Sequence, residues 1–260
     1  MSVLSARSVS GLPEVHAGDD LAALIVRALE NEPHHSEPRE PSLREGQIVA
    51  IAHKAVSKAE GAVVALAGIE PSERACELAA AQGKDARAVQ VVLDQSREVL
   101  RAANGVLICR THHGFVCANA GVDASNAAVA DSLIVLPRDP DASARRLRAR
   151  LRELTGVVAA VLITDSFGRA WRHGQCDVAI GCAGIAALDD WRGRRDSSGM
   201  ELQATWIALA DAVAAAADLA RAKDSREPVV IVDGLQRFVT EADGPGAVEL
   251  LRPLDEDLFR

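Results

Sequence analysis

The most informative part of the sequence is Val157–Arg172, VVAAVLITDSFGRAWR. Its first part, Val157–Ile163, is an apolar run rich in β-branched residues, and such a run predicts a buried strand. Thr164, Asp165 and Ser166 follow it directly. A carboxylate and a hydroxyl at the end of a buried strand are two oxygen ligands on a rigid support. Because Mg²⁺ and Mn²⁺ prefer oxygen ligands, the stretch indicates a divalent-cation site at Asp165 and Ser166.

Two arginines extend this motif. Arg169 and Arg172 are three residues apart, so a helical turn would place both guanidinium groups on one side. Cation-binding oxygens beside guanidinium groups indicate a site for metal-bound phosphate, with Asp165, Arg169 and Arg172 as candidate catalytic residues. The alternative is a strand-to-turn junction at which the aspartate caps a helix and both arginines are solvated. This stretch alone leaves both interpretations open.

A second segment, HHGFVCANAGVDASN over 112–126, offers further oxygen ligands. Asp123 and Asn126 stand among Gly, Ala and Ser, and such small residues let an ion or a ligand approach the backbone closely. A turn, or the first turn of a helix, would bring the two side-chain oxygens together. The alternative is that Asp123 or Ser125 is the N-cap of a helix in the alanine-rich stretch that follows.

A third segment, AHKAVSKAEG over 52–61, follows the apolar run Ile48–Ala52. Lys54 and Lys58 lie where the predicted strand passes into a loop, and an ammonium group there is suited to meeting a phosphate. The alternative is that both are solvated loop lysines.

Together, these segments resemble the coenzyme F-420-0:γ-glutamyl ligase family, whose members add glutamate to the precursor of the deazaflavin coenzyme F-420. The resemblance covers nearly the whole chain. It is closer to bacterial members, including the ligase half of bifunctional actinobacterial proteins, in which a connector similar to 245–260 leads into a nitroreductase-like domain. The blocks that carry it are GLPEVHAGDDL (11–21), AHKAVSKAEG (52–61), HGFVCANAGVDASN (113–126), ITDSFGRAWRHGQCDVAIGCAGI (163–185), DWRGRRDSSGMEL (190–202) and EPVVIVDG (227–234).

The resemblance implies an acid–amino-acid ligase that depends on GTP and on two divalent cations, Mg²⁺ or Mn²⁺, with a monovalent cation as a further cofactor. It implies that GTP converts the carboxylate of F-420-0 into an acyl phosphate, which the amine of L-glutamate attacks. It also implies a mixed two-lobed α+β fold with substantial antiparallel sheet in an interlocked homodimer. The implied nucleotide contacts are Leu12, Pro13, Glu14, Val15, His53, Lys58 and Asn126; Asp123 and Asp165 would bind one divalent cation and Ser166 a second.

Three positions depart from the family pattern. His53 stands where family members often have Ser. Lys223 lies about where archaeal members carry a Gln or Glu for the second cation, so we expect Lys223 to face the nucleotide phosphates or solvent. Asp233 stands where many members have Arg, which would bring negative charge near a phosphate site. These departures leave two alternatives open: a related NTP-dependent amide ligase with another substrate, and a non-catalytic module that binds nucleotide or deazaflavin.

Composition narrows the class of protein. Hydrophobic residues make up 48% of the 260 residues and charged residues 25%, as is ordinary for a globular protein. The formal charge of −8 argues against a nucleic-acid or membrane-surface partner. No apolar run approaches the roughly 18 residues of a membrane span. No signal-peptide pattern opens the chain, so a cytoplasmic location is expected. The five cysteines show no CxxC spacing, which favours reduced thiols, and neither common glycine-rich nucleotide fingerprint is present.

The remaining pattern predicts one ligase domain over 1–260 of the α+β or mixed α/β class. The segment 31–42, NEPHHSEPREPS, is expected to be a mobile surface loop. Helices are expected over 21–30, 73–82, 142–155 and 201–222, strands over 48–52, 132–136, 157–163 and 229–232, a short apolar run over 89–93, and a hairpin joining 106–110 to 114–118.

Overall fold

The structure is a computed structural model that describes residues 3–31, 43–124, 131–222 and 224–257. Two residues singled out above, Asn126 and Lys223, lie outside the described residues, as does nearly all of the expected loop 31–42. No described helix is both long and apolar enough to cross a bilayer.

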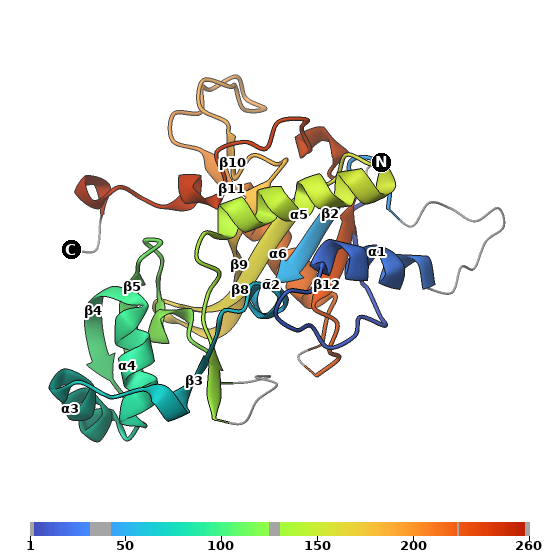
Figure 1. Cartoon of the computed structure of the whole chain (residues 1–260). Coiled ribbons are helices and arrows are strands. Elements are labelled where there is room, and N and C mark those ends of the chain that lie inside the picture. The colour runs from blue at the N-terminus through green and yellow to red at the C-terminus, as the bar shows by residue number, and fades with distance from the viewer. Residues whose placement is uncertain (1–2, 32–42, 125–130, 223, 258–260) are drawn as a thin grey trace.

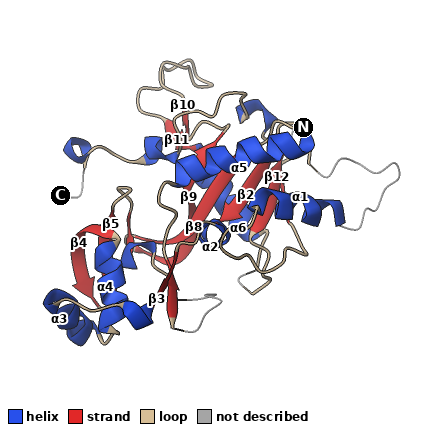
Figure 2. Ribbon diagram, in the orientation of Figure 1, coloured by secondary structure: helices blue, strands red, loops and turns tan. Residues whose placement is uncertain are grey.

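A five-stranded mixed sheet forms the centre of the larger group of elements (Figures 1 and 2). The strand order is β1–β12–β2–β8–β9, and every pairing is antiparallel except that of β2 with β8. Helices together with mainly antiparallel strands confirm the predicted α+β class. The strands are β1 (Ser5–Ser8), β12 (Val229–Asp233), β2 (Ile48–Ala52), β8 (Ala160–Arg169) and β9 (Arg172–Ala183).

Helices cover both faces of this sheet. The side chains of β2 alternate between two clusters: Val49 and Ile51 pack with α1 and α5, whereas Ile48 and Ala50 pack with α6 on the other face. Because both faces are buried, the central strands are apolar along almost their whole length. The helices are α1 (Leu21–Asn31), α5 (Pro140–Thr155) and α6 (Leu209–Leu219).

A second group of elements encloses its own hydrophobic cluster (teal to green in Figure 1). In it, Val89 and Val92 of α4 pack with Leu107 and Cys109 of β5. A two-stranded ribbon, β3 with β7, lies beside a further small cluster that includes Leu133. The elements are α3 (Glu73–Gln82), α4 (Ala86–Asp94), β4 (Ser96–Ala103), β5 (Val106–Thr111), β6 (Val116–Ala118), β3 (Val63–Ala65) and β7 (Ser132–Ile134).

The expected elements largely coincide with the observed ones. The helix over 73–82, the strand over 48–52 and the hairpin of β5 with β6 are confirmed, and the apolar run 89–93 is the buried side of α4. The helix expected over 201–222 is wrong in its first part, where β11 (Trp206–Ala208) pairs with β10 (Leu188–Asp190). Trp206 and Ile207 favour a strand once a partner strand is available, and the alanine-rich helix begins only at Leu209.

Candidate functional site

The site forms where β2 ends beside β8. The parallel register pairs Ala52 with Thr164, so Asp165 is the first residue of β8 beyond the end of its neighbour. The chain leaves β2 directly into helix α2 (His53–Ala59), which begins at the same edge of the sheet. Contrary to expectation, β8 does not end at Ile163; it continues through Arg169, paired with β9. The polar residues of the motif therefore lie within a strand.

Two polar groups face the Asp165 carboxylate. Its Oδ1 accepts the backbone N–H of Ser166 at 2.7 Å, and the Nε2 of His53 lies 3.4 Å from the same oxygen. His53 is buried, and its Nε2 makes no hydrogen bond within the described part of the chain, while its Nδ1 lies 3.4 Å from the Ser57 hydroxyl. Thus Asp165 is the polar group that His53 faces, and the imidazole does not lie on an open nucleotide-contacting surface.

Ser166 projects from the face of β8 opposite to that of Asp165, because adjacent strand residues alternate between faces. There it belongs to a buried hydrogen-bond network. Its hydroxyl donates to Asp177 at 2.6 Å, and the Thr164 hydroxyl donates to the other oxygen of Asp177 at 2.9 Å. The guanidinium of Arg221 pairs with Asp177 and donates to Thr164 at 2.7 Å and to the Pro228 carbonyl at 3.1 Å. The network therefore holds the Ser166 hydroxyl in a fixed orientation.

The sequence interpretation did not include Asp177 and Arg221. One signal for Asp177 was present: it precedes the run Val178–Ala183, in a strand whose later residues are buried. A carboxylate at the start of such a run needs partners in the core. Arg221 carried no comparable signal, because its contact joins residues 44 positions apart in the chain.

Asp123 comes to the site from the second group of elements. Its backbone N–H and carbonyl both bond to Ile134 of β7, at 3.0 and 2.8 Å, which fixes the segment beside the ribbon. Its carboxylate pairs with the Lys54 ammonium of α2 at 2.6 Å. Lys54 thus lies on a helix, and not on the loop expected from the sequence.

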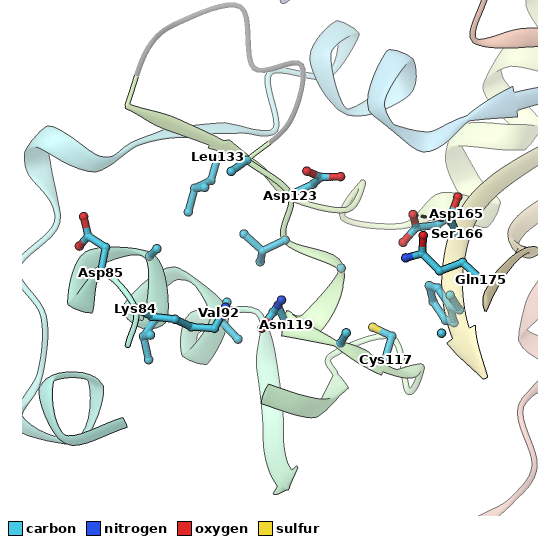
Figure 3. A pocket seen from close by; sticks show the side chains of 18 residues that line it. Lys84, Asp85, Val92, Cys117, Asn119, Asp123, Leu133, Asp165, Ser166 and Gln175 are labelled. Atoms are coloured by element: carbon cyan, nitrogen blue, oxygen red, sulfur yellow. Dashed lines mark hydrogen bonds between the residues drawn. The ribbon is translucent and has the colours of Figure 1, made fainter. Parts of the chain in front are cut away.

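One pocket of about 500 Å³ has Asp123, Asp165 and Ser166 in its lining. In Figure 3 the carboxylates of Asp123 and Asp165 point toward the space between them. Asp123 is therefore brought to the same cavity as Asp165 and Ser166, which lie about 40 residues further along the chain. Among the described residues, no three His, Cys, Asp or Glu side chains are grouped closely enough to form a metal centre unaided.

Lys58 and the N-terminal loop meet on the neighbouring surface. The Lys58 ammonium lies 2.5 Å from the Glu14 carboxylate, and the Gly18 N–H bonds to the Ala59 carbonyl at 2.9 Å, which ties the loop to α2. Val15 is buried in the core, and Leu12 packs against the same core. The expected nucleotide-contacting segments, 12–15 and α2, are therefore adjacent in space.

The two arginines of the motif are placed differently from expectation. Arg169 and Arg172 face each other across the tight end of the β8–β9 hairpin, with Trp171 at positive φ in the turn. They do not share a helix face, and both are exposed. Neither belongs to the lining of the pocket, and the Arg169 guanidinium donates to the His173 carbonyl.

Asp233 is also remote from the site. Strand β12 runs antiparallel to β2, with Val232 opposite Ile48, so Asp233 lies at the other end of the sheet, roughly 15–20 Å along the strands from Asp165. Hydrogen bonds from Gln47, the Gly234 N–H and Arg44 lower the pKa of its carboxyl. Asp233 also pairs with Arg44 at 2.5 Å, so it brings no negative charge to the end of the sheet where Asp165 lies.

The cysteines are all free thiols, as the sequence predicts. Cys117 lines the pocket, but burial raises its pKa to about 12, so it is protonated at neutral pH. Because the thiolate is the reactive form, we expect iodoacetamide at pH 8 to label exposed Cys76 and to leave Cys117 unmodified until the protein is unfolded. Peptide mapping checks this prediction, and rapid native labelling of Cys117 would contradict it.

Comparison with known proteins agrees with the family resemblance seen in the sequence. The profile of the F-420-0:gamma-glutamyl ligase family matches residues 11–234. The coenzyme F-420:L-glutamate ligase of Methanopyrus kandleri is 46% identical over 249 residues, which is 95% of this chain and 94% of that protein. The protein of the same name from Methanothermobacter thermautotrophicus is 43% identical over 99% of both chains, and that from Archaeoglobus fulgidus is 41% identical over 97% and 94%. The chain belongs to the F-420-0:gamma-glutamyl ligase family.

Proposed function

We propose that this protein is a GTP- and divalent-metal-dependent ligase that joins L-glutamate to coenzyme F-420-0. The observation that carries the proposal is the convergence of Asp123, Asp165 and Ser166 on one pocket, with Lys54 and Lys58 on the adjoining helix. The names of the relatives support the acceptor and the amino acid. We also propose that the two groups of elements are the two lobes of the family fold and that the active form is an interlocked homodimer.

The donor set suits Mg²⁺ or Mn²⁺. Asp123 and Asp165 offer carboxylate oxygens, which these hard cations prefer. Since Ser166 has a single hydroxyl proton and donates it to Asp177, its oxygen is left to act as an acceptor or a ligand, as a second cation requires. Mg²⁺ usually takes only one or two protein carboxylates and completes its shell with phosphate oxygens and water, so a compact three-carboxylate cluster is not needed.

Such cations would supply charge neutralisation to the phosphates during transfer. On binding at Asp123, a cation would replace the Lys54 ammonium, which now pairs with that carboxylate. Lys54 would then be available to a phosphate oxygen beside it. Lys58 would contact another phosphate, with Glu14 exchanging that partner for the nucleotide. Asn126 remains a proposed nucleotide contact. We assign no catalytic role to Arg169 and Arg172, since neither lines the pocket.

The chemistry addressed is carboxylate activation. An oxygen of the acceptor carboxylate attacks the γ-phosphorus of GTP, the bond to the β-phosphate oxygen breaks, and GDP leaves. The amine of L-glutamate then attacks the acyl carbon, phosphate leaves, and the nitrogen loses a proton as the amide forms. The chain contributes mainly by positioning: β8 holds Asp165 and Ser166, and α2 holds the two lysines.

Replacing Lys58 tests the nucleotide side. Lys58→Met keeps much of the aliphatic stem and removes the charge, so we expect GTP to bind roughly 10-fold more weakly or worse, as for the loss of a hydrogen bond to a charged group. Calorimetric titration with GTP measures this directly. Arg101→Met, an exposed cation on β4, serves as the control. Equal GTP affinities for Lys58→Met and the unmodified protein would show that Lys58 is a surface lysine that does not contact the nucleotide.

The function itself is tested by turnover. Purified protein incubated with F-420-0, L-glutamate, GTP and Mn²⁺ should release phosphate only when all of these are present. Binding of GTP and F-420-0 without phosphate release would favour the non-catalytic module instead. Light scattering after gel filtration should give the mass of two chains; a single-chain mass would contradict the homodimer.

A further inference from the structure

The pocket has two chemically distinct ends. At one end lie Asp165, Ser166 and Gln175, and at the other lie Lys84 and Asp85 at the start of α4, as Figure 3 shows. Between them, beside the polar residues Asn119 and Asp123, lies an apolar surface. It includes Ala88, Val89, Val92, Val122 and Leu133.

The nucleotide-binding residues proposed above lie outside this cavity. Glu14, Lys54 and Lys58 do not contribute to its lining, whereas Asp123 both lines it and pairs with Lys54. Asp123 therefore marks the boundary between the lysine-bearing side of the site and the pocket. If the transferred phosphoryl group lies between Asp123 and Asp165, the pocket is the space left for the molecule that receives it.

We propose, building on the function given above, that this pocket binds the acceptor substrate along its length. The acceptor carboxylate would lie at the Asp165 end, and the flat deazaflavin ring system would lie against the apolar surface of α4 and Leu133. A cavity of about 500 Å³ falls within the range that suits a small-molecule ligand, and its apolar surface would pack against a flat ring while its polar residues fix the ring's orientation.

Lys84 gives the far end its specificity. It is half-buried, and its ammonium forms no ion pair with any residue that the structure describes. The neighbouring Asp85 carboxylate does not neutralise it, because Asp85 caps α4 and pairs with Arg87 at 2.7 Å. An ammonium at the end of an apolar pocket favours an oxygen-bearing edge of a heterocycle. Lys84 is therefore a recognition residue for the ring, at a distance from the reacting carboxylate.

Three variants test the two halves of this proposal by direct binding of F-420-0, in the presence of Mg²⁺ and without nucleotide or glutamate. Lys84→Met should weaken F-420-0 binding about 10-fold and should alter the absorbance shift of the bound chromophore, because a charge next to the ring is lost. Lys84→Arg should restore much of both. Ala88→Phe places a ring in the cavity and should abolish F-420-0 binding while GTP affinity stays as in the unmodified protein.

The matched control is Arg101→Met, which removes a cation from β4 outside the pocket and should bind F-420-0 normally. Unchanged F-420-0 affinity in both Lys84→Met and Ala88→Phe would overturn the proposal, as would loss of GTP affinity in Ala88→Phe with F-420-0 binding intact. Binding is measured apart from turnover. An unmodified protein that binds F-420-0 in this pocket but forms no amide would refute the proposed ligase function and leave the acceptor site standing.

Discussion

Asp165→Asn is expected to reduce kcat/KM for glutamate ligation by on the order of 10³-fold or more while the protein stays folded. The reason is local. The amide oxygen can still accept the Ser166 N–H, so the strand keeps its geometry, but the charge that would hold a cation is lost. Several kilocalories per mole of charge stabilisation in the transition state correspond to a rate change of this size. Steady-state kinetics at saturating Mn²⁺ measure the effect, and the thermal midpoint reports the fold.

Asp196→Asn is the matched control for this variant. The Asp196 carboxylate also accepts a nearby backbone N–H, from Ser198 at 2.8 Å, but it lies in an exposed loop that does not line the pocket. Its amide variant should keep full activity. Near-normal turnover by Asp165→Asn at saturating Mn²⁺ would show that Asp165 is not a cation ligand.

The second large effect concerns stability. Arg221→Met should lower the free energy of unfolding by about 3–5 kcal/mol, because it removes the guanidinium that pairs with the buried Asp177 carboxylate. The Arg221 side chain is 9% exposed and that of Asp177 is 2% exposed, so water cannot replace the lost contact. Urea denaturation followed by circular dichroism measures the change.

Arg44→Met provides the comparison, because Arg44 also pairs with an aspartate, Asp233, but its side chain is 49% exposed. Solvent-exposed ion pairs contribute little to stability, so Arg44→Met should lower the free energy of unfolding by no more than about 1 kcal/mol. If Arg221→Met and Arg44→Met proved equally mild, the buried network would not hold the end of β8 as described. Loss of second-cation affinity in Arg221→Met would further link the network to Ser166.

The apolar pattern predicted three of the five strands of the central sheet, β2, β8 and β12, because strands buried on both faces must be apolar. It did not predict β1 and β9, which are partly exposed. The strands at 48–52 and 229–232 were therefore apparent from composition. The full extent of β8 was not apparent from the sequence. Its continuation through Arg169 depends on pairing with β9, which supplies a partner for polar residues that would otherwise read as a turn. A long-range partner overrides a local signal in the same way at β11.

The site was predictable in part for a similar reason. Asp123, Asp165 and Ser166 were singled out as oxygen-bearing residues and by the family resemblance, and the fold brings them to one pocket; their role as cation ligands stays a prediction. Asp177 and Arg221 act through a contact across the sheet that no local pattern encodes. The position of Asp233 could not be predicted locally, because it depends on strand direction. Strand β12 runs antiparallel to β2, so its carboxyl end lies away from the carboxyl end of β2.

The proposed reaction is activation of the F-420-0 carboxylate in this pocket for attack by glutamate. It is tested most directly by mass spectrometry of a reaction containing F-420-0 labelled with ¹⁸O in its terminal carboxylate, together with L-glutamate, GTP and Mn²⁺. We expect a product heavier by one glutamyl residue and one ¹⁸O atom in the released phosphate. An unchanged F-420-0 mass, or a glutamylated product with no ¹⁸O in the phosphate, would contradict it.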